Sequence, residues 1–153
     1  MLSLCIFWSS CEDETISCGP TIQLWDIAYC IQDTIELDLT SSNLSGEIPS
    51  EIEQLVNLIK LDLKNNSLSG IIPSSLSNLQ NLVELNLYDN QLTGQINEAI
   101  TDLSALNYLT LEDNEFSGGI PADIKNLTNL TGLDLRGNKF GCYDYDFNAP
   151  SSE

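Results

Sequence analysis

The sequence predicts an α/β fold: a right-handed solenoid shaped as a short horseshoe, with a parallel β-sheet on its concave face and short 3₁₀ or helical turns on its convex face. Three observations support this prediction. Leucines recur with a 24-residue period, an asparagine follows four of the five leucine clusters, and Gly-x-Ile-Pro or a close variant comes next in the four complete repeats. One repeat cannot bury its leucines alone, so the repeats must stack and share a core.

Five repeats span residues 34–140, and the last one is incomplete. They begin at Thr34, Leu58, Leu82, Leu106 and Leu130. In the second repeat, Leu61 and Leu63 stand two residues apart, so on a strand both side chains point the same way. Lys60, Asp62 and Lys64 then point to the opposite side of the sheet. The repeats therefore predict leucines that face the core and an outer row of variable residues.

A second recurring feature is an asparagine three residues after the last strand leucine. The four positions are Asn66, Asn90, Asn114 and Asn138, and the first repeat has Ser42 instead. A buried amide must find hydrogen-bond partners, so we expect this asparagine ladder to bond the backbone of successive turns. Leu76, Leu79 and Leu82 then recur at every third residue, which suits a short 3₁₀ or helical segment on the outer face.

The repeated string L-x-x-L-x-L-x-x-N-x-L-S/T-G-x-I-P resembles the plant-type leucine-rich repeat. Proteins with this repeat include receptor-kinase ectodomains and secreted bacterial leucine-rich-repeat lipoproteins. The resemblance covers residues 34 to 140. It implies a module that binds a protein, a peptide or a glycan, mostly through the concave strand face.

Residues 18–33 resemble the N-terminal cap of this family, in which a tryptophan shortly precedes a disulfide cysteine. The resemblance implies a Cys18–Cys30 disulfide that holds Trp25 over the first repeat; the alternative is a pair of buried free thiols. Four of the five cysteines lie in the first 30 residues. Such clustering at one end favours an oxidising, extracellular setting.

Residues 1–17 are expected to be the remnant of an export signal followed by an acidic linker. A short apolar stretch ends in Ser9, Ser10 and Cys11, which resembles a bacterial lipoprotein signal and predicts a lipid on Cys11. This predicts a cell-surface protein attached to a membrane through that lipid. The alternative is a secreted protein or an ectodomain fragment in which Cys11 forms a disulfide.

Residues 141–153 are expected to form a C-terminal cap and tail. Tyr143, Tyr145 and Phe147 alternate, which predicts one apolar face over the last leucines. The nearby acidic residues do not fit a calcium loop, because Ala149 stands where an EF-hand needs glycine. We therefore expect no metal here.

The charge of the chain narrows the classes of partner. The sequence has 23 acidic and 5 basic residues, a formal charge of -18, and no histidine. Nucleic acids and anionic membrane surfaces are poor partners for such a protein. Carboxylates on an open sheet lack the burial that acid–base catalysis needs. We expect no enzyme, no cofactor and a monomer.

The outward-facing strand residues are the predicted ligand-binding residues. They are Lys60, Asp62, Lys64, Glu84, Asn86, Tyr88, Tyr108, Thr110, Glu112, Asp134 and Arg136. Tyr88 and Tyr108 supply large contact areas at low entropic cost and are the expected hot spots. Lys60 and Lys64 on one repeat, with Arg136 and Lys139 at the far end, suggest an acidic partner docked at two points.

Two other functions stay open at this stage. One is a structural or adhesion element on the cell surface without a single ligand. The other is an ectodomain fragment of a receptor kinase. N-glycosylation sequons begin at Asn43, Asn65, Asn126 and Asn129, and they matter only in a eukaryotic secretory pathway.

Overall fold

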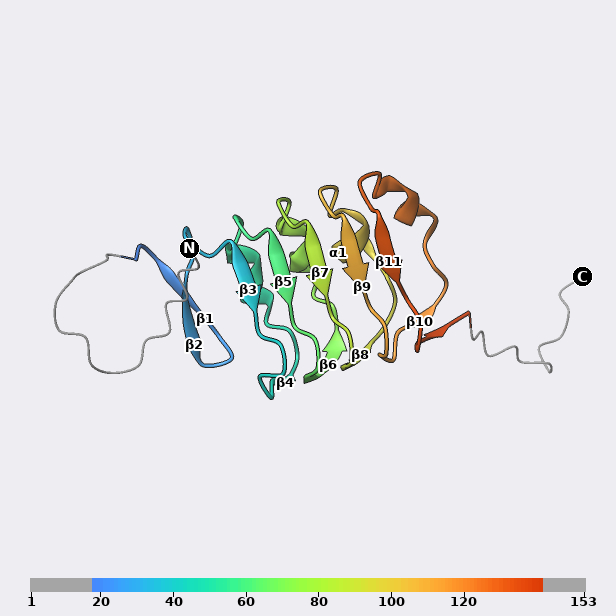
Figure 1. Ribbon diagram of the computed structural model, residues 1–153, viewed down its shortest axis with the longest axis horizontal. Coiled ribbons are helices and arrows are strands. Elements are labelled where there is room, and N and C mark those ends of the chain that lie inside the picture. The colour runs from blue at the N-terminus through green and yellow to red at the C-terminus, as the bar shows by residue number, and fades with distance from the viewer. Residues whose placement is uncertain (1–17, 142–153) are drawn as a thin grey trace, which may run out of the picture.

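The computed structural model describes residues 18–141, and its main element is a five-stranded parallel sheet. The strands are β3 (Glu36–Asp38), β5 (Lys60–Asp62), β7 (Glu84–Asn86), β9 (Tyr108–Thr110) and β11 (Gly132–Asp134). They lie side by side in chain order (Figure 1). Each strand pairs with the next so that equivalent residues of successive repeats stand side by side. Leu61, for example, lies between Leu37 and Leu85. The predicted solenoid with a parallel sheet is confirmed.

A second set of short parallel strands follows the turn after each main strand. The strands β4 (Ser45–Gly46), β6 (Ser67–Ile71) and β8 (Gln91–Thr93) pair with one another, and β10 (Ser117–Gly118) pairs with β12 (Lys139–Phe140). These strands are not among the elements predicted from the sequence. Their residues are mostly Ser, Thr, Gly and Gln, which have no strand pattern of their own, so stacking between repeats creates these bonds.

Short helical turns close each repeat on the side away from the five-stranded sheet. Three are 3₁₀ turns, η1 (Ser50–Gln54), η2 (Ser74–Asn78) and η3 (Ala122–Asn126), and each follows a proline. The fourth is the α-helical turn α1 (Glu98–Thr101), where Asn97 replaces the proline and its side chain accepts a hydrogen bond from the Ala99 amide at 3.1 Å. Asparagine is a preferred N-cap, which explains the different turn. Within residues 18–141, no helix is long and apolar enough to cross a membrane.

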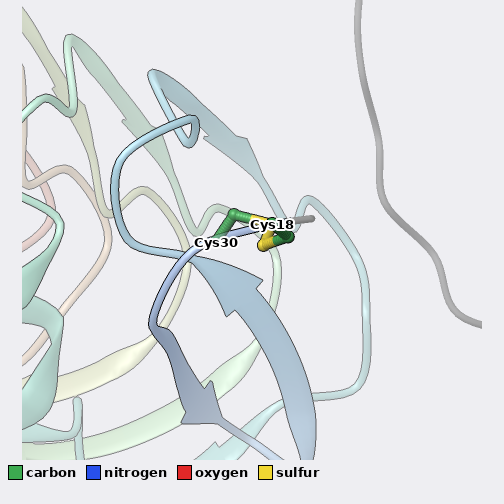
Figure 2. Close-up of a disulfide and its surroundings, with 2 residues drawn as sticks. All are labelled: Cys18 and Cys30. Carbon is green, nitrogen blue, oxygen red and sulfur yellow. A yellow bond between two sulfur atoms is a disulfide. The ribbon is translucent and has the colours of Figure 1, made fainter. Parts of the chain in front are cut away.

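The N-terminal end is covered by an antiparallel hairpin. Its strands are β1 (Thr21–Leu24) and β2 (Ile27–Cys30), and Ile22 and Leu24 join the core of the first repeats. Cys18 and Cys30 form the disulfide, with their Cα atoms 5.7 Å apart (Figure 2). Trp25 lies at the hairpin turn, half-buried and packed against the same core. The hairpin thus separates the first leucines from solvent.

The core is a stack of leucines contributed equally by the inner repeats. Leu61, Leu85 and Leu109 are at most 1% exposed, whereas Leu133 in the last strand is 46% exposed. Burying such a side chain is worth about 2–3 kcal/mol. Within residues 18–141, the inner strands therefore have a neighbouring strand on both sides, and β11 has one on one side only.

Candidate functional site

The candidate site is the outer surface of the five-stranded sheet, called the strand face below. Three rows of side chains form it, running across the strands. The first row is Glu36, Lys60, Glu84, Tyr108 and Gly132; the second is Asp38, Asp62, Asn86, Thr110 and Asp134; the third is Thr40, Lys64, Tyr88, Glu112 and Arg136. The intervening leucines point into the core, because side chains alternate along a strand.

The asparagine ladder holds the backbone just beyond the strand face. The Asn90 side chain donates to the carbonyl of Leu63 in the preceding repeat at 3.0 Å, and its oxygen accepts from the Leu68 amide at 3.0 Å. Asn66, Asn114 and Asn138 make the equivalent bonds. These amides satisfy backbone groups that would otherwise be stranded inside the turn. Each repeat is thereby fixed to its neighbour at the edge of the candidate site.

The second row has a structural task that the sequence analysis missed. The side-chain oxygens of Asp38, Asp62, Asn86 and Asp134 each accept a hydrogen bond from the backbone amide two residues later, at 3.1–3.2 Å. This is the Asx-turn that lets Asp and Asn end a strand. The signal in the sequence is the Leu-Asp/Asn-Leu string at four of the five strands. The first and third rows are left to carry most of the variable contacts.

Asp62 differs from the exposed carboxylate expected at this position, since it is only 2% exposed. Lys64 covers it, with the Lys64 ammonium 3.3 Å from its carboxylate, and Asn86 donates to the same oxygen at 3.4 Å. A carboxylate between two strands is compensated by such donors. Asp62 therefore positions its neighbours and offers a ligand little surface.

The cations of the strand face are paired with acids of the chain itself. Lys60 contacts Glu84 at 3.1 Å, Lys64 contacts Asp62, and Arg136 contacts Asp134 at 2.6 Å and Glu112 at 2.9 Å. Lys139, outside the strand face, pairs with Glu115 at 2.9 Å. The expected docking points for an acidic partner are thus occupied by carboxylates of the chain itself.

These pairs shift the ionisation of the groups involved. The hydrogen bond from the Arg136 side chain lowers the pKa of Asp134 from 3.8 to about 2, and the same contact raises the pKa of Arg136. The bond to Glu84 raises the pKa of Lys60, and the Thr40 hydroxyl lowers the pKa of Asp38. Every shift favours the charged form. Asp38 and Asp134 are therefore held as carboxylates, and Lys60 and Arg136 as cations.

The two predicted tyrosine hot spots occupy different environments. Tyr108 is 55% exposed, and a Cβ added to Gly132 on the next strand would lie 2.5 Å from its Cδ1 atom. Its ring thus covers the place of the missing side chain, an arrangement known from other sheets in which an aromatic ring shields a glycine. Tyr88, in the third row, is half-buried. Gly132 is not among the residues predicted from the sequence, although it stands one repeat after Tyr108.

A hollow opens between β7 and β9. Its volume is about 330 Å³, and Glu84, Leu85, Asn86, Tyr108 and Thr110 line it. Four of these five residues belong to the predicted ligand-binding set. The volume lies at the lower end of the range for ligand pockets, about 300–1,000 Å³. It suits one side chain of a partner better than a whole ligand.

Other predicted features lie outside the described residues. They include the proposed lipid attachment at Cys11 and the C-terminal cap of Tyr143, Tyr145 and Phe147. Both remain predictions.

The geometry of a repeated strand, asparagine turn and return path agrees with comparisons to known protein families. Family models described as leucine-rich repeat match residues 35–92 and residues 105–127, together more than half of the chain. The chain is a leucine-rich-repeat protein. Comparison with curated protein sequences gives no match.

Solved structures similar to this leucine-rich-repeat protein include plant receptor ectodomains. The TDR receptor has 38% identity and a TM-score of 0.69, covering 71% of this chain and 19% of that chain. The Arabidopsis receptor kinase HAESA, solved with the peptide hormone IDA and the co-receptor SERK1, has 44% identity and a TM-score of 0.66, covering 69% and 18%.

The BIR2 ectodomain from Arabidopsis thaliana is similar at 40% identity and a TM-score of 0.66, covering 68% of this chain and 55% of that chain. The chain therefore spans less than two thirds of each of these proteins. The resemblance to receptor-kinase ectodomains that the sequence predicts is confirmed for the repeat region.

Proposed function

We propose that this protein is a non-catalytic extracellular binding module that holds a protein or peptide against its strand face. The observation that carries the proposal is a constant scaffold beneath variable side chains. Leucines and asparagines repeat with little change, while the first and third rows differ from strand to strand. Such a surface suits specificity, because its side chains can vary without disturbing the core.

Two further observations support the proposal. The HAESA structure holds a peptide hormone, and a similar structure, the peptide hormone receptor RGFR1, is in complex with RGF2. The Cys18–Cys30 disulfide favours an oxidising compartment, since disulfides are rare in the reducing cytosol. Both point to an extracellular binding role.

A peptide-display selection on the immobilised full chain tests the proposal. Selected peptides are measured against the double variant Tyr88→Ala with Tyr108→Ala and against a control, Val56→Ala with Ile71→Ala. The control residues are 48% and 59% exposed and lie off the strand face. The tyrosine variant should lose about 2–4 kcal/mol of binding, the range expected for hot spots.

The control variant should bind like the wild type, and both variants should be folded at the temperature of the binding measurement. If the control variant loses binding while the tyrosine variant keeps it, the strand face is not the binding surface. If no peptide or protein binds saturably, the result supports the alternative of a surface display element without a single ligand.

The likeness to receptor ectodomains also favours a second proposal, that the chain is part of a larger receptor. A longer gene product with a membrane-spanning segment and a kinase domain after the repeats would support it. A lipid on Cys11 would be the competing form of surface attachment. An intact mass that shows cleavage before Cys11 and an added lipid would favour the lipoprotein.

A further inference from the structure

We infer that the partner of the strand face presents a basic segment, and that one of its Lys or Arg side chains enters the hollow between Glu84 and Tyr108. This inference rests on the proposed function and adds the chemistry of the partner. It is carried by the position of the Tyr108 ring, the composition of the hollow and the charge of the strand face.

The position of the Tyr108 ring explains why the hollow exists. The ring lies over Gly132 on β11, where an added Cβ would come within 2.9 Å of its Cε1 atom as well as 2.5 Å of its Cδ1 atom. No other row of the strand face contains a glycine. Since the ring leans toward β11, the space on the β7 side stays open.

The hollow is chemically suited to a cation. Glu84 contributes a carboxylate, Tyr108 an aromatic ring, and Thr110 a hydroxyl. Carboxylates only accept hydrogen bonds, and aromatic rings attract ammonium and guanidinium groups. A partner group that combines several donors with a positive charge satisfies both at once. An anionic group would instead meet Glu84 directly.

Lys60 does not block this role, although it pairs with Glu84. The contact is to Oε1 at 3.1 Å, and the Glu84 side chain remains 36% exposed. A carboxylate has two oxygens with about four acceptor sites, so Glu84 can contact Lys60 and a second cation together. Lys60 nevertheless repels that second cation. Removing the Lys60 charge should therefore strengthen binding of a basic peptide, whereas removing the Glu84 charge should weaken it.

The wider charge distribution favours the same partner. The three rows of the strand face contain six carboxylates and three cations, a formal charge of -3. The chain as a whole carries a formal charge of -18. An acidic surface attracts basic segments over several ångströms and raises their association rate.

The test uses a blocked heptapeptide of alternating Gly and Arg and its counterpart with citrulline, which has arginine's shape without the charge. Both are titrated into the full chain at 150 mM salt, with the backbone amides followed by NMR. The Arg peptide should bind at least about fivefold more tightly, the fold-change expected for a cation–π contact plus an ion pair. The largest shifts should fall on residues 84–88 and 108–110.

Matched variants separate the hollow from general attraction to acids. Glu84→Gln should weaken binding of the Arg peptide, and Lys60→Gln should strengthen it. Glu115→Gln is the control, because Glu115 also makes one ion pair but lies off the strand face. Gly132→Ala should weaken binding because its methyl group displaces the Tyr108 ring. Gly19→Ala is the control, because the nearest atom to its methyl group is Gln32 Oε1, at an ordinary contact distance of 4.0 Å.

Three results would overturn the inference. Equal binding of the Arg and citrulline peptides removes the charge requirement. Equal effects of Glu84→Gln and Glu115→Gln, or shifts spread over the acids of η1 and η3, indicate non-specific attraction. If a Glu-containing peptide shifts the resonances of residues 84–88 and 108–110 more strongly than the Arg peptide does, the partner is not basic. The proposed function would still stand in that case. The proposed function fails on a separate result: loss of peptide binding in the Val56→Ala and Ile71→Ala control while the tyrosine variant still binds.

Discussion

The two ends of the stack bury equivalent leucines to very different extents. Leu37 in β3 is 4% exposed, whereas Leu133 at the same place in β11 is 46% exposed. The β1–β2 hairpin packs over the first repeat, and within residues 18–141 no further strand pairs with the outer edge of β11. Burial in this fold therefore depends on the neighbouring repeat more than on the residue itself.

This difference also divides the candidate site. Glu84 and Tyr108 lie on β7 and β9, which have paired strands on both sides. Asp134 and Arg136 belong to β11 and the turn after it, at the edge of the sheet. Groups that recognise a partner need supporting neighbours that hold their geometry. The contrast between ends thus favours the middle strands as the binding surface.

The largest expected effect comes from truncating one leucine in each environment. Leu85→Ala should cost about 3–5 kcal/mol of stability, because it removes a side chain that is 1% exposed and leaves a cavity. Leu133→Ala should cost about 1 kcal/mol or less. Urea unfolding of both variants measures the difference. Equal costs would contradict the comparison and show that another segment covers Leu133.

The next effect concerns what closes the N-terminal end. The double variant Cys18→Ser with Cys30→Ser should lose about 2–4 kcal/mol, because the disulfide constrains a separation of 12 residues in the unfolded chain. Thermal unfolding in the absence of reductant gives the loss. With reductant present, the wild type and the variant should have the same thermal midpoint. If their midpoints still differ, the loss of stability comes from the serine side chains and not from the missing disulfide.

The asparagine ladder should show the same contrast at smaller scale. Asn90→Leu should lower stability by about 1–3 kcal/mol, since Asn90 is 8% exposed and bonds backbone groups of the preceding repeat and of its own. Asn138→Leu, at the half-buried end of the ladder, should cost less. An unchanged urea midpoint for Asn90→Leu would show that the asparagine ladder does not stabilise the fold.

The smallest expected effect is a change in ionisation at the open edge. The pKa of Asp134 is about 2 in the folded chain, below its ordinary value of 3.8. Its pairing therefore stabilises the fold above about pH 4, and this stabilisation is lost as the pH falls toward 2. Arg136→Gln should return the pKa of Asp134 toward 3.8, as read by NMR of the side-chain carboxyl carbon. A pKa unchanged by this substitution would exclude Arg136 as the cause.

The sequence predicts the repeated features of this molecule well. Leu61 and Asn66 recur at one fixed spacing, and only a stack of parallel strands satisfies all copies at once. The outward rows follow from the same alternation. The second set of strands could not be predicted, because strands such as Ser45–Gly46 have no side-chain pattern and exist only through stacking.

The details of the site depend on neighbours that lie 24 residues apart in the sequence. Asp62 is buried because Lys64 and Asn86 cover it, and Tyr108 leans over β11 because Gly132 leaves room. Charge counts alone indicated basic docking points at Lys60 and Arg136. The ion pairs that occupy them depend on side-chain conformations, which a sequence pattern does not specify.

The central claim is that the middle strands open less readily than the edge strand and so hold the binding surface in place. Hydrogen exchange of the free full chain tests this claim most directly. The Leu87 amide bonds the Thr110 carbonyl between two closed repeats at 2.9 Å, and the Gly132 amide bonds the Asn107 carbonyl at the open edge at 3.1 Å. The account predicts that Leu87 exchanges at least about tenfold more slowly than Gly132, a difference of about 1.4 kcal/mol in opening free energy. Equal exchange at the two amides, after correction for intrinsic rates, would contradict it.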